Sequence, residues 1–167
     1  MKTIRLPAIV LTVLILCYLA YMAYSASLLP ERVATHFDTS GQPDGWMSRS
    51  GYLIFMGALG IGAPLITVFT ALISKYIPYK LINLPNKQYW LLPEHREQTY
   101  LYMTCLLLWM GCLEVIFFAG IHFLTIEANR AQPLELNMER FFILMGSFAA
   151  IIVLWLIVLI YHFKKTG

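Results

Sequence analysis

Charged residues are scarce in this chain. Asp, Glu, Lys and Arg make up 13% of its 167 residues, whereas 59% are hydrophobic. Soluble domains carry about 25% charged and about 45–50% apolar residues, so this composition excludes a globule with a water-facing surface. The formal net charge is only +3, and its scattered lysines and arginines make no basic face for nucleic acid. We therefore expect a small helical bundle solvated by lipid.

Motifs of catalysis and metal binding are also missing. The chain contains no H-E-x-x-H, no G-x-S-x-G and no glycine-rich loop at a helix start, which argues against the enzyme classes that use them. Its three cysteines lie inside apolar runs and define no disulfide framework. Cys105 and Cys112 are expected to be small packing residues rather than a metal or redox pair. We predict a protein that is not an enzyme and has no cofactor or bound metal.

Four apolar runs are long enough to cross a membrane. The first spans 23 residues, about 35 Å as a helix, against a hydrocarbon core of about 30 Å. Its basic start and small residues at 25–27 also fit a cleaved signal peptide, but its length and the three later runs favour a retained helix. The fold prediction is all-α: one polytopic membrane domain, a four-transmembrane-helix bundle with a structured extracytoplasmic loop between helices 1 and 2. The spans cover about residues 6–28, 52–74, 100–126 and 140–163.

Lysine and arginine are divided unevenly between the two sides of such a bundle. The N-terminus, the connection 75–99 and the C-terminus hold eight of them, and the other two connections hold four. The positive-inside rule predicts that the side with eight is cytoplasmic. Both termini then lie in the cytoplasm, and the loop 29–51 faces outward.

The loop 29–51 has the composition of a shaped segment. Its glycines, prolines and Asp, Ser and Thr side chains specify turns, which a flexible tether would not need. The spacing of its His and Asp residues fits neither a calcium loop nor a zinc site. We predict a surface that recognises a peptide, lipid or protein partner, with a membrane-surface enzyme using His36 and Asp44 as an alternative. The candidate binding residues are His36, Asp38, Asp44 and Trp46.

The connection 75–99 is predicted to be mostly extended, because each of its three prolines disfavours helix in the preceding residue. Tyr89 and Trp90 are expected at the membrane interface. Pro93 and Glu94 resemble the first turn of the third helix, where an acidic side chain is favourable.

Glu114 is the most costly residue to place in lipid. It lies near the middle of the third run. Placing a carboxylate there costs several kcal/mol of insertion free energy, so the group must be protonated, paired with another group or hydrated. One interpretation is a station on a proton or cation path, with His122 as the next. The other is an interhelical hydrogen bond, with His122 at the interface near Glu127, which is where we expect it.

The second run contains glycine, alanine and proline. Ala58 and Gly62 are predicted to form a close helix contact, and Pro64 is predicted to kink the helix about midway.

Two long motifs resemble a known family. The run L-P-E-R-V-A-T-H-F-D-T-S-G-Q-P-D-G-W after the first helix resembles the signature of a bacterial integral-membrane family of unknown function. Its domain also forms the N-terminal part of SdpI-type immunity proteins, which protect bacteria from a secreted toxic peptide. The run I-N-L-P-N-K-Q-Y-W-L-L-P-E-H-R is similar to the second signature of the family's stand-alone members. The resemblance covers about residues 29–110, and SdpI-type proteins have further membrane helices that this chain lacks.

The resemblance implies a multi-pass protein of the bacterial cytoplasmic (inner) membrane with two signatures on opposite faces. The outer signature is Pro30, His36, Phe37, Gly41, Asp44, Gly45 and Trp46. The inner signature is Asn83, Pro85, Asn86, Lys87, Tyr89, Trp90, Glu94 and Arg96, of which Asn86, Lys87, Trp90, Glu94 and Arg96 join the candidate binding residues.

Two functions follow as hypotheses. The first is a recognition, immunity or signalling protein in the lipid bilayer whose outer loop binds a peptide or membrane-protein partner. The alternative is a small proton-coupled transporter or channel that uses Glu114, as a homo-oligomer because four helices enclose little space. Neither involves nucleic acid.

Overall fold

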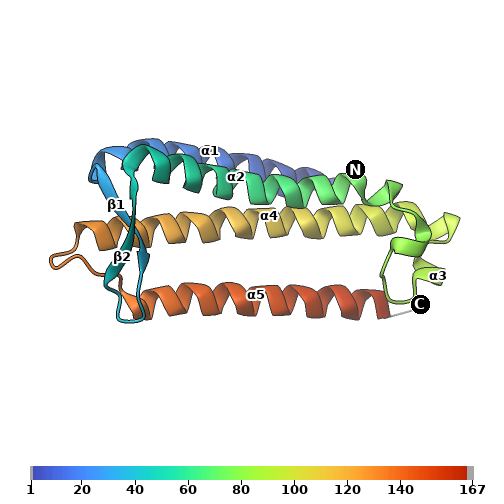
Figure 1. The fold of residues 1–167 in the computed structure, drawn as a ribbon. Helices are drawn as coiled ribbons and strands as arrows, with labels where there is room; N and C mark the ends of the chain where they lie inside the picture. Colours follow the sequence, from blue (N-terminus) through green and yellow to red (C-terminus); the bar gives the residue numbers. More distant parts are fainter. Residues whose placement is uncertain (1, 165–167) are drawn as a thin grey trace.

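The computed structural model describes residues 2–164 and contains four helices that are long and apolar enough to cross a membrane. The chain is thus a multi-pass membrane protein. The N-terminal end of α1, α3 and the C-terminal end of α5 lie at one end of the bundle, which we call the α3 end (Figure 1). The long helices are α1 (Lys2–Ser25), α2 (Arg49–Ile73), α4 (Pro93–Arg130) and α5 (Met138–Lys164); α3 (Lys87–Trp90) is a single turn.

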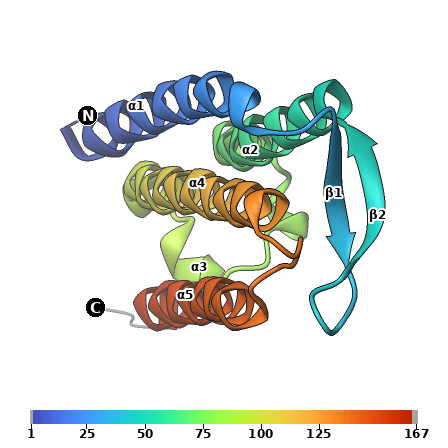
Figure 2. The same cartoon turned by 90° about the vertical axis from the view of Figure 1, so that its left-hand side faces the viewer.

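Helix α4 lies between the other long helices, with α1 and α2 on one side and α5 on the other (Figure 2). Most buried apolar residues of α1, α2 and α4 form one core, which includes Cys112 as a packing residue. In α5, by contrast, the buried side chain is Phe163, in its last turn. The helices α1, α2 and α4 therefore make the packed centre, and α5 is attached to it.

The close contact between α1 and α2 centres on Tyr18 and Gly60. The Tyr18 hydroxyl donates to the Met56 carbonyl at 2.8 Å, and a Cβ at Gly60 would lie 2.4 Å from the Tyr18 ring. Gly62 has open space around it, so the predicted contact through Ala58 and Gly62 is wrong by about half a helical turn. Helix α2 continues through Pro64 as one helix, with that proline buried.

The all-α prediction is wrong at residues 29–51, where the structure has a β-hairpin instead of a loop. Strands β1 (Arg32–Phe37) and β2 (Pro43–Ser48) pair antiparallel across the end of the bundle opposite α3, here called the hairpin end (Figure 1). The pairing has irregularities on both sides of His36. These bulges break the simple alternation of polar and apolar residues by which a strand is recognised in a sequence.

The hairpin turn is built by Asp38 and Gly41. One carboxylate oxygen of Asp38 accepts hydrogen bonds from the backbone N–H groups of Ser40 and Gln42, at 2.8 and 2.9 Å. Gly41 has φ of +84°, a conformation that suits glycine. Its carbonyl accepts from the Leu136 N–H at 2.9 Å, and a Cβ there would lie 2.5 Å from the Leu136 carbonyl oxygen. The turn therefore docks on the connection between α4 and α5.

Asn129, in the last turn of α4, fixes the middle of β1. Its side-chain oxygen accepts from the Ala34 N–H at 2.8 Å, and its side-chain nitrogen donates to the Ala34 carbonyl at 2.9 Å. Ala34 and its neighbour Val33 are fully buried. The amide thus pairs with β1 as a neighbouring strand would, and it ties the hairpin to the longest helix.

Replacing Asn129 with alanine should loosen the hairpin. Asn129→Ala leaves a buried N–H and carbonyl of Ala34 without partners, at about 1–3 kcal/mol for each buried group left unpaired. We expect faster hydrogen exchange across Arg32–Phe37 and a lower midpoint of SDS unfolding. Asn137→Ala is the matched control for hydrogen exchange, because the Asn137 side chain accepts from the exposed Arg140 N–H at the start of α5 and not from β1. Unchanged protection of Ala34 in Asn129→Ala would contradict this role.

Candidate functional site

The exposed side of the hairpin brings four polar and aromatic side chains together, and we call them the hairpin face: Arg32, His36, Asp44 and Trp46. His36 Nδ1 and Asp44 Oδ1 form an ion pair, with side chains 75% and 48% exposed. The Arg32 guanidinium lies 5.3 Å from the centre of the Trp46 ring, and Trp46 is 40% exposed. The sequence predicted three of these residues. It missed Arg32, whose proximity to Trp46 follows only from the strand register.

Gly45 allows His36 and Asp44 to share a face. Gly45 lies opposite His36, and a Cβ at Gly45 would come within 2.7 Å of the His36 Cβ. Because Asp44 accepts the proton on Nδ1, His36 Nε2 is left as the ring atom that can meet a partner. The face therefore presents an aromatic surface with charges of both signs, all in water. Asp38, predicted beside these residues, lies in the turn and holds it.

A buried chain of hydrogen bonds joins α1, α2 and α4 around His122. The Tyr52 hydroxyl lies 2.7 Å from His122 Nδ1, and His122 Nε2 lies 2.6 Å from the Ser25 Oγ. Since the Ser25 hydroxyl donates to the Met22 carbonyl at 3.1 Å, it accepts from Nε2–H, and Nδ1 accepts from Tyr52. The hydroxyl groups of Ser25 and Tyr52 and both ring nitrogens of His122 therefore all have hydrogen-bond partners.

His122 was predicted to lie at the membrane interface, and its exposed fraction of 0% shows that the ring is packed inside the bundle. Its ring stacks on Tyr52, with ring centres 5.5 Å apart, and meets the edge of Tyr21 at 5.1 Å. The arrangement ties α1, α2 and α4 together through one imidazole.

Tyr52→Phe should destabilise the bundle. It leaves the buried Nδ1 of His122 without a donor, at about 1–3 kcal/mol. Tyr24→Phe is the control, because Tyr24 is 70% exposed and removing its hydroxyl should change stability by less than about 0.5 kcal/mol. The measurement is the SDS-unfolding midpoint of each purified variant. Equal midpoints for the two variants would show that the hydrogen bonds around His122 do not stabilise the bundle.

At the α3 end, Asn86 and Trp90 close the last turn of α5. The Asn86 side chain donates to the carbonyls of Phe163 at 3.3 Å and Lys164 at 3.0 Å, and Trp90 Nε1 donates to Phe163 at 2.9 Å. The last carbonyls of a helix have no partner within it. Asn86 itself has φ of +50°, which asparagine tolerates better than most residues. These two signature residues therefore cap a helix more than 70 positions later.

Lys87 also has structural contacts. Its ammonium donates to the carbonyls of Tyr79 and Ile82 at 3.3 and 3.0 Å and lies 4.7 Å from the centre of the Tyr79 ring. Lys87 thus holds the turns that precede α3. The remaining two predicted residues lie apart from it: Glu94 is exposed in the first turn of α4, and the Arg96 guanidinium lies 5.6 Å from the Tyr100 ring centre.

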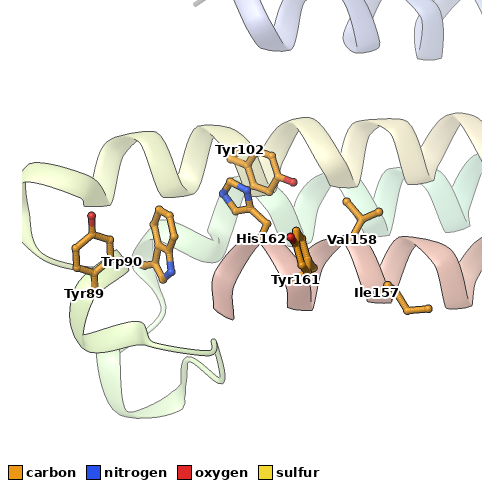
Figure 3. Close-up of a pocket in the computed structure, with 7 residues that line it drawn as sticks. All are labelled: Tyr89, Trp90, Tyr102, Ile157, Val158, Tyr161 and His162. Carbon is orange, nitrogen blue, oxygen red and sulfur yellow. The ribbon is translucent and has the colours of Figure 1, made fainter. Parts of the chain in front are cut away.

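An aromatic pocket adjoins this cap. His162 of α5 lies between Tyr102 and Trp90, with ring centres 3.8 and 5.3 Å away (Figure 3). The pocket measures about 550 Å³. Stacked rings of this kind hold the end of α5 against α4 and α3. The lining residues are Tyr89, Trp90, Tyr102, Ile157, Val158, Tyr161 and His162.

Removing the cap should fray α5. Asn86→Ala and Trp90→Phe each delete donors to the last carbonyls, at about 0.5–1.5 kcal/mol per hydrogen bond. We expect faster hydrogen exchange over the last turn of α5, with the middle of the helix unchanged. Asn83→Ala is the matched control, since Asn83 is exposed and three positions away. If Asn83→Ala frays the helix equally, the cap is not specific to Asn86.

Glu114 faces the place where α2, α4 and α5 meet. Thr67 Oγ1 of α2 lies 2.9 and 3.1 Å from its two carboxylate oxygens. The same two residues line a cavity of about 360 Å³ whose other walls come from α4, α5 and Ala63 of α2. The predicted interhelical hydrogen bond is therefore present, and the carboxylate also borders open space.

Comparison with known proteins yields one family. Residues 13–61 match a domain of unknown function (DUF1648). The match includes the second half of α1, the whole hairpin and the first half of α2. It does not include α3. No curated protein and no solved structure matches the chain.

Proposed function

We propose that this chain is a non-enzymatic membrane protein whose hairpin face binds a peptide or protein partner. The observation that carries the proposal is a hairpin fixed at both its middle and its turn, with Arg32 and Trp46 stacked in the open beside the His36–Asp44 pair. Tryptophan and arginine are enriched among residues that dominate binding energy. A surface that is already ordered loses little conformational freedom on binding.

We further propose that the hairpin end faces outward from a bacterial cytoplasmic membrane. The structure groups the N-terminus, the 75–99 connection and the end of α5 at the α3 end, and the sequence places most lysines and arginines there. Such segments favour the cytoplasm. The resemblance of the hairpin sequence to SdpI-type immunity proteins supports capture of a peptide, in immunity or signalling, as the purpose of this face.

Photocrosslinking in native membranes tests the hairpin face. A photoreactive residue at Gln42, exposed two positions before Asp44, should yield a specific adduct, whereas the same residue at Gln132 on the neighbouring connection should not. Trp46→Ala should reduce the adduct roughly fivefold or more, because truncating such an anchor typically costs more than about 1 kcal/mol. Trp109→Ala is the matched control, since Trp109 is also 40% exposed but lies midway along α4.

Equal adducts at Gln42 and Gln132, or no dependence on Trp46, would refute recognition by this face. Clean negatives at Gln42 with a well-expressed protein would do the same.

A second candidate function is proton-coupled transport through Glu114, in a homo-oligomer. The observation that favours it is a carboxylate in a membrane helix beside an open cavity, where ionisable residues are functional candidates. In the crosslinking experiment Glu114→Gln should leave the Gln42 adduct intact. In proteoliposomes the same variant should abolish flux if the chain transports, while Trp46→Ala should not.

A further inference from the structure

The cavity beside Glu114 opens between α5 and the packed centre of the bundle. α5 is attached to α4 at both ends. At the hairpin end Phe141 and Leu144 pack with Leu124 and Ala128 of α4, and at the α3 end His162 stacks on Tyr102 of α4, with ring centres 3.8 Å apart. Between these attachments the walls are apolar except for Thr67 and Glu114. The other lining residues are Ala63, Leu107, Met110, Phe117, Phe118, Phe148, Ile152, Trp155 and Leu156.

The Glu114 carboxylate has unused hydrogen-bonding capacity toward this cavity. An ionised carboxylate offers about four acceptor positions. Among residues 2–164, Thr67 is its donor, and one hydroxyl proton is shared between the two oxygens. An apolar occupant such as a lipid chain would desolvate the charge without compensating it, which is costly. A cation would instead compensate the negative charge of the carboxylate.

The walls also suit an organic cation. The rings of Phe117 and Phe148 stack with centres 4.2 Å apart and 17° between their planes. Trp155 lines the same cavity, with its Nε1 donating to the Leu106 carbonyl at 3.3 Å, so its polar atom is already satisfied. Aromatic faces attract cations, and more strongly where water is excluded. Ligand pockets commonly measure about 300–1,000 Å³, a range that includes this one.

We propose that this cavity binds a lipophilic organic cation: an aromatic or alkyl body bearing one positive charge, with the charge beside Glu114 and the body against the rings of α4 and α5. The inference names a ligand class for the second function proposed above and rests on the same site. The proposal concerns equilibrium binding, so a binding measurement tests it whether or not the protein transports the ligand.

Equilibrium binding of radiolabelled tetraphenylphosphonium to the full chain in nanodiscs tests the proposal. Saturable binding is expected for the wild type, and Glu114→Gln should weaken it at least tenfold. Glu97→Gln is the matched control, because Glu97 is an exposed carboxylate near the start of the same helix, and its binding should equal that of the wild type. Triphenylphosphine oxide, which is aromatic but neutral, should fail to displace the label.

A second variant keeps the test decisive if Glu114→Gln does not fold. Ile152→Trp fills the cavity from α5 and leaves Glu114 and Thr67 intact, so it should also abolish saturable binding. Absence of saturable binding in the wild type, full binding by Glu114→Gln or Ile152→Trp, or displacement by the neutral competitor would each overturn the proposal; the last would show an apolar cavity only. Binding without flux in proteoliposomes would support the ligand class and refute transport.

Discussion

The length of α4 is the constraint on which the rest of the structure depends. Its 38 residues span about 57 Å, against about 40–45 Å for a bilayer including its headgroups. The excess makes a platform at each end: Asn129 holds β1 at one, and the Thr99 hydroxyl donates to the Trp90 carbonyl at 2.9 Å near the other. Because His122 and Glu114 lie on the same helix, one rigid element sets the spacing between both water-facing segments and both buried polar sites.

The polar residues of the hairpin divide into those that build it and those that it displays. Asp38, Gly41 and Gly45 have geometric roles: a turn, a positive φ and a close approach. His36 and Trp46 are exposed on the hairpin face. At the α3 end the balance is different, since Asn86, Lys87 and Trp90 are all engaged with backbone carbonyls. Helix ends near lipid need such partners, because little water is present to supply them.

Hydropathy was enough to predict the four long helices, because apolar length is a direct physical requirement of crossing a bilayer. The hairpin was missed because two irregularities around His36 disturb its period and because Gly41, Pro43 and Gly45 are typical of loops. The burial and the partners of His122 were missed for another reason. A histidine near the end of an apolar run fits an interface equally well, and only the tertiary fold brings Ser25 and Tyr52 to its two nitrogens. Glu114 was identified because a single acidic residue among apolar neighbours is evident in the sequence as well as in the structure.

The contacts at the two ends of α5 also have a consequence for how the protein is synthesised and folded. Its partners at both ends, Leu124 and Ala128 near its start and Asn86 and Trp90 near its finish, all precede it in the chain. A ribosome therefore delivers α5 after its partners, to a three-helix core whose receiving surfaces are already synthesised, in keeping with the N-to-C order of folding during translation. Until α5 is inserted, the side of α4 that carries Glu114 faces the lipid, and the insertion of α5 is the step that forms the cavity.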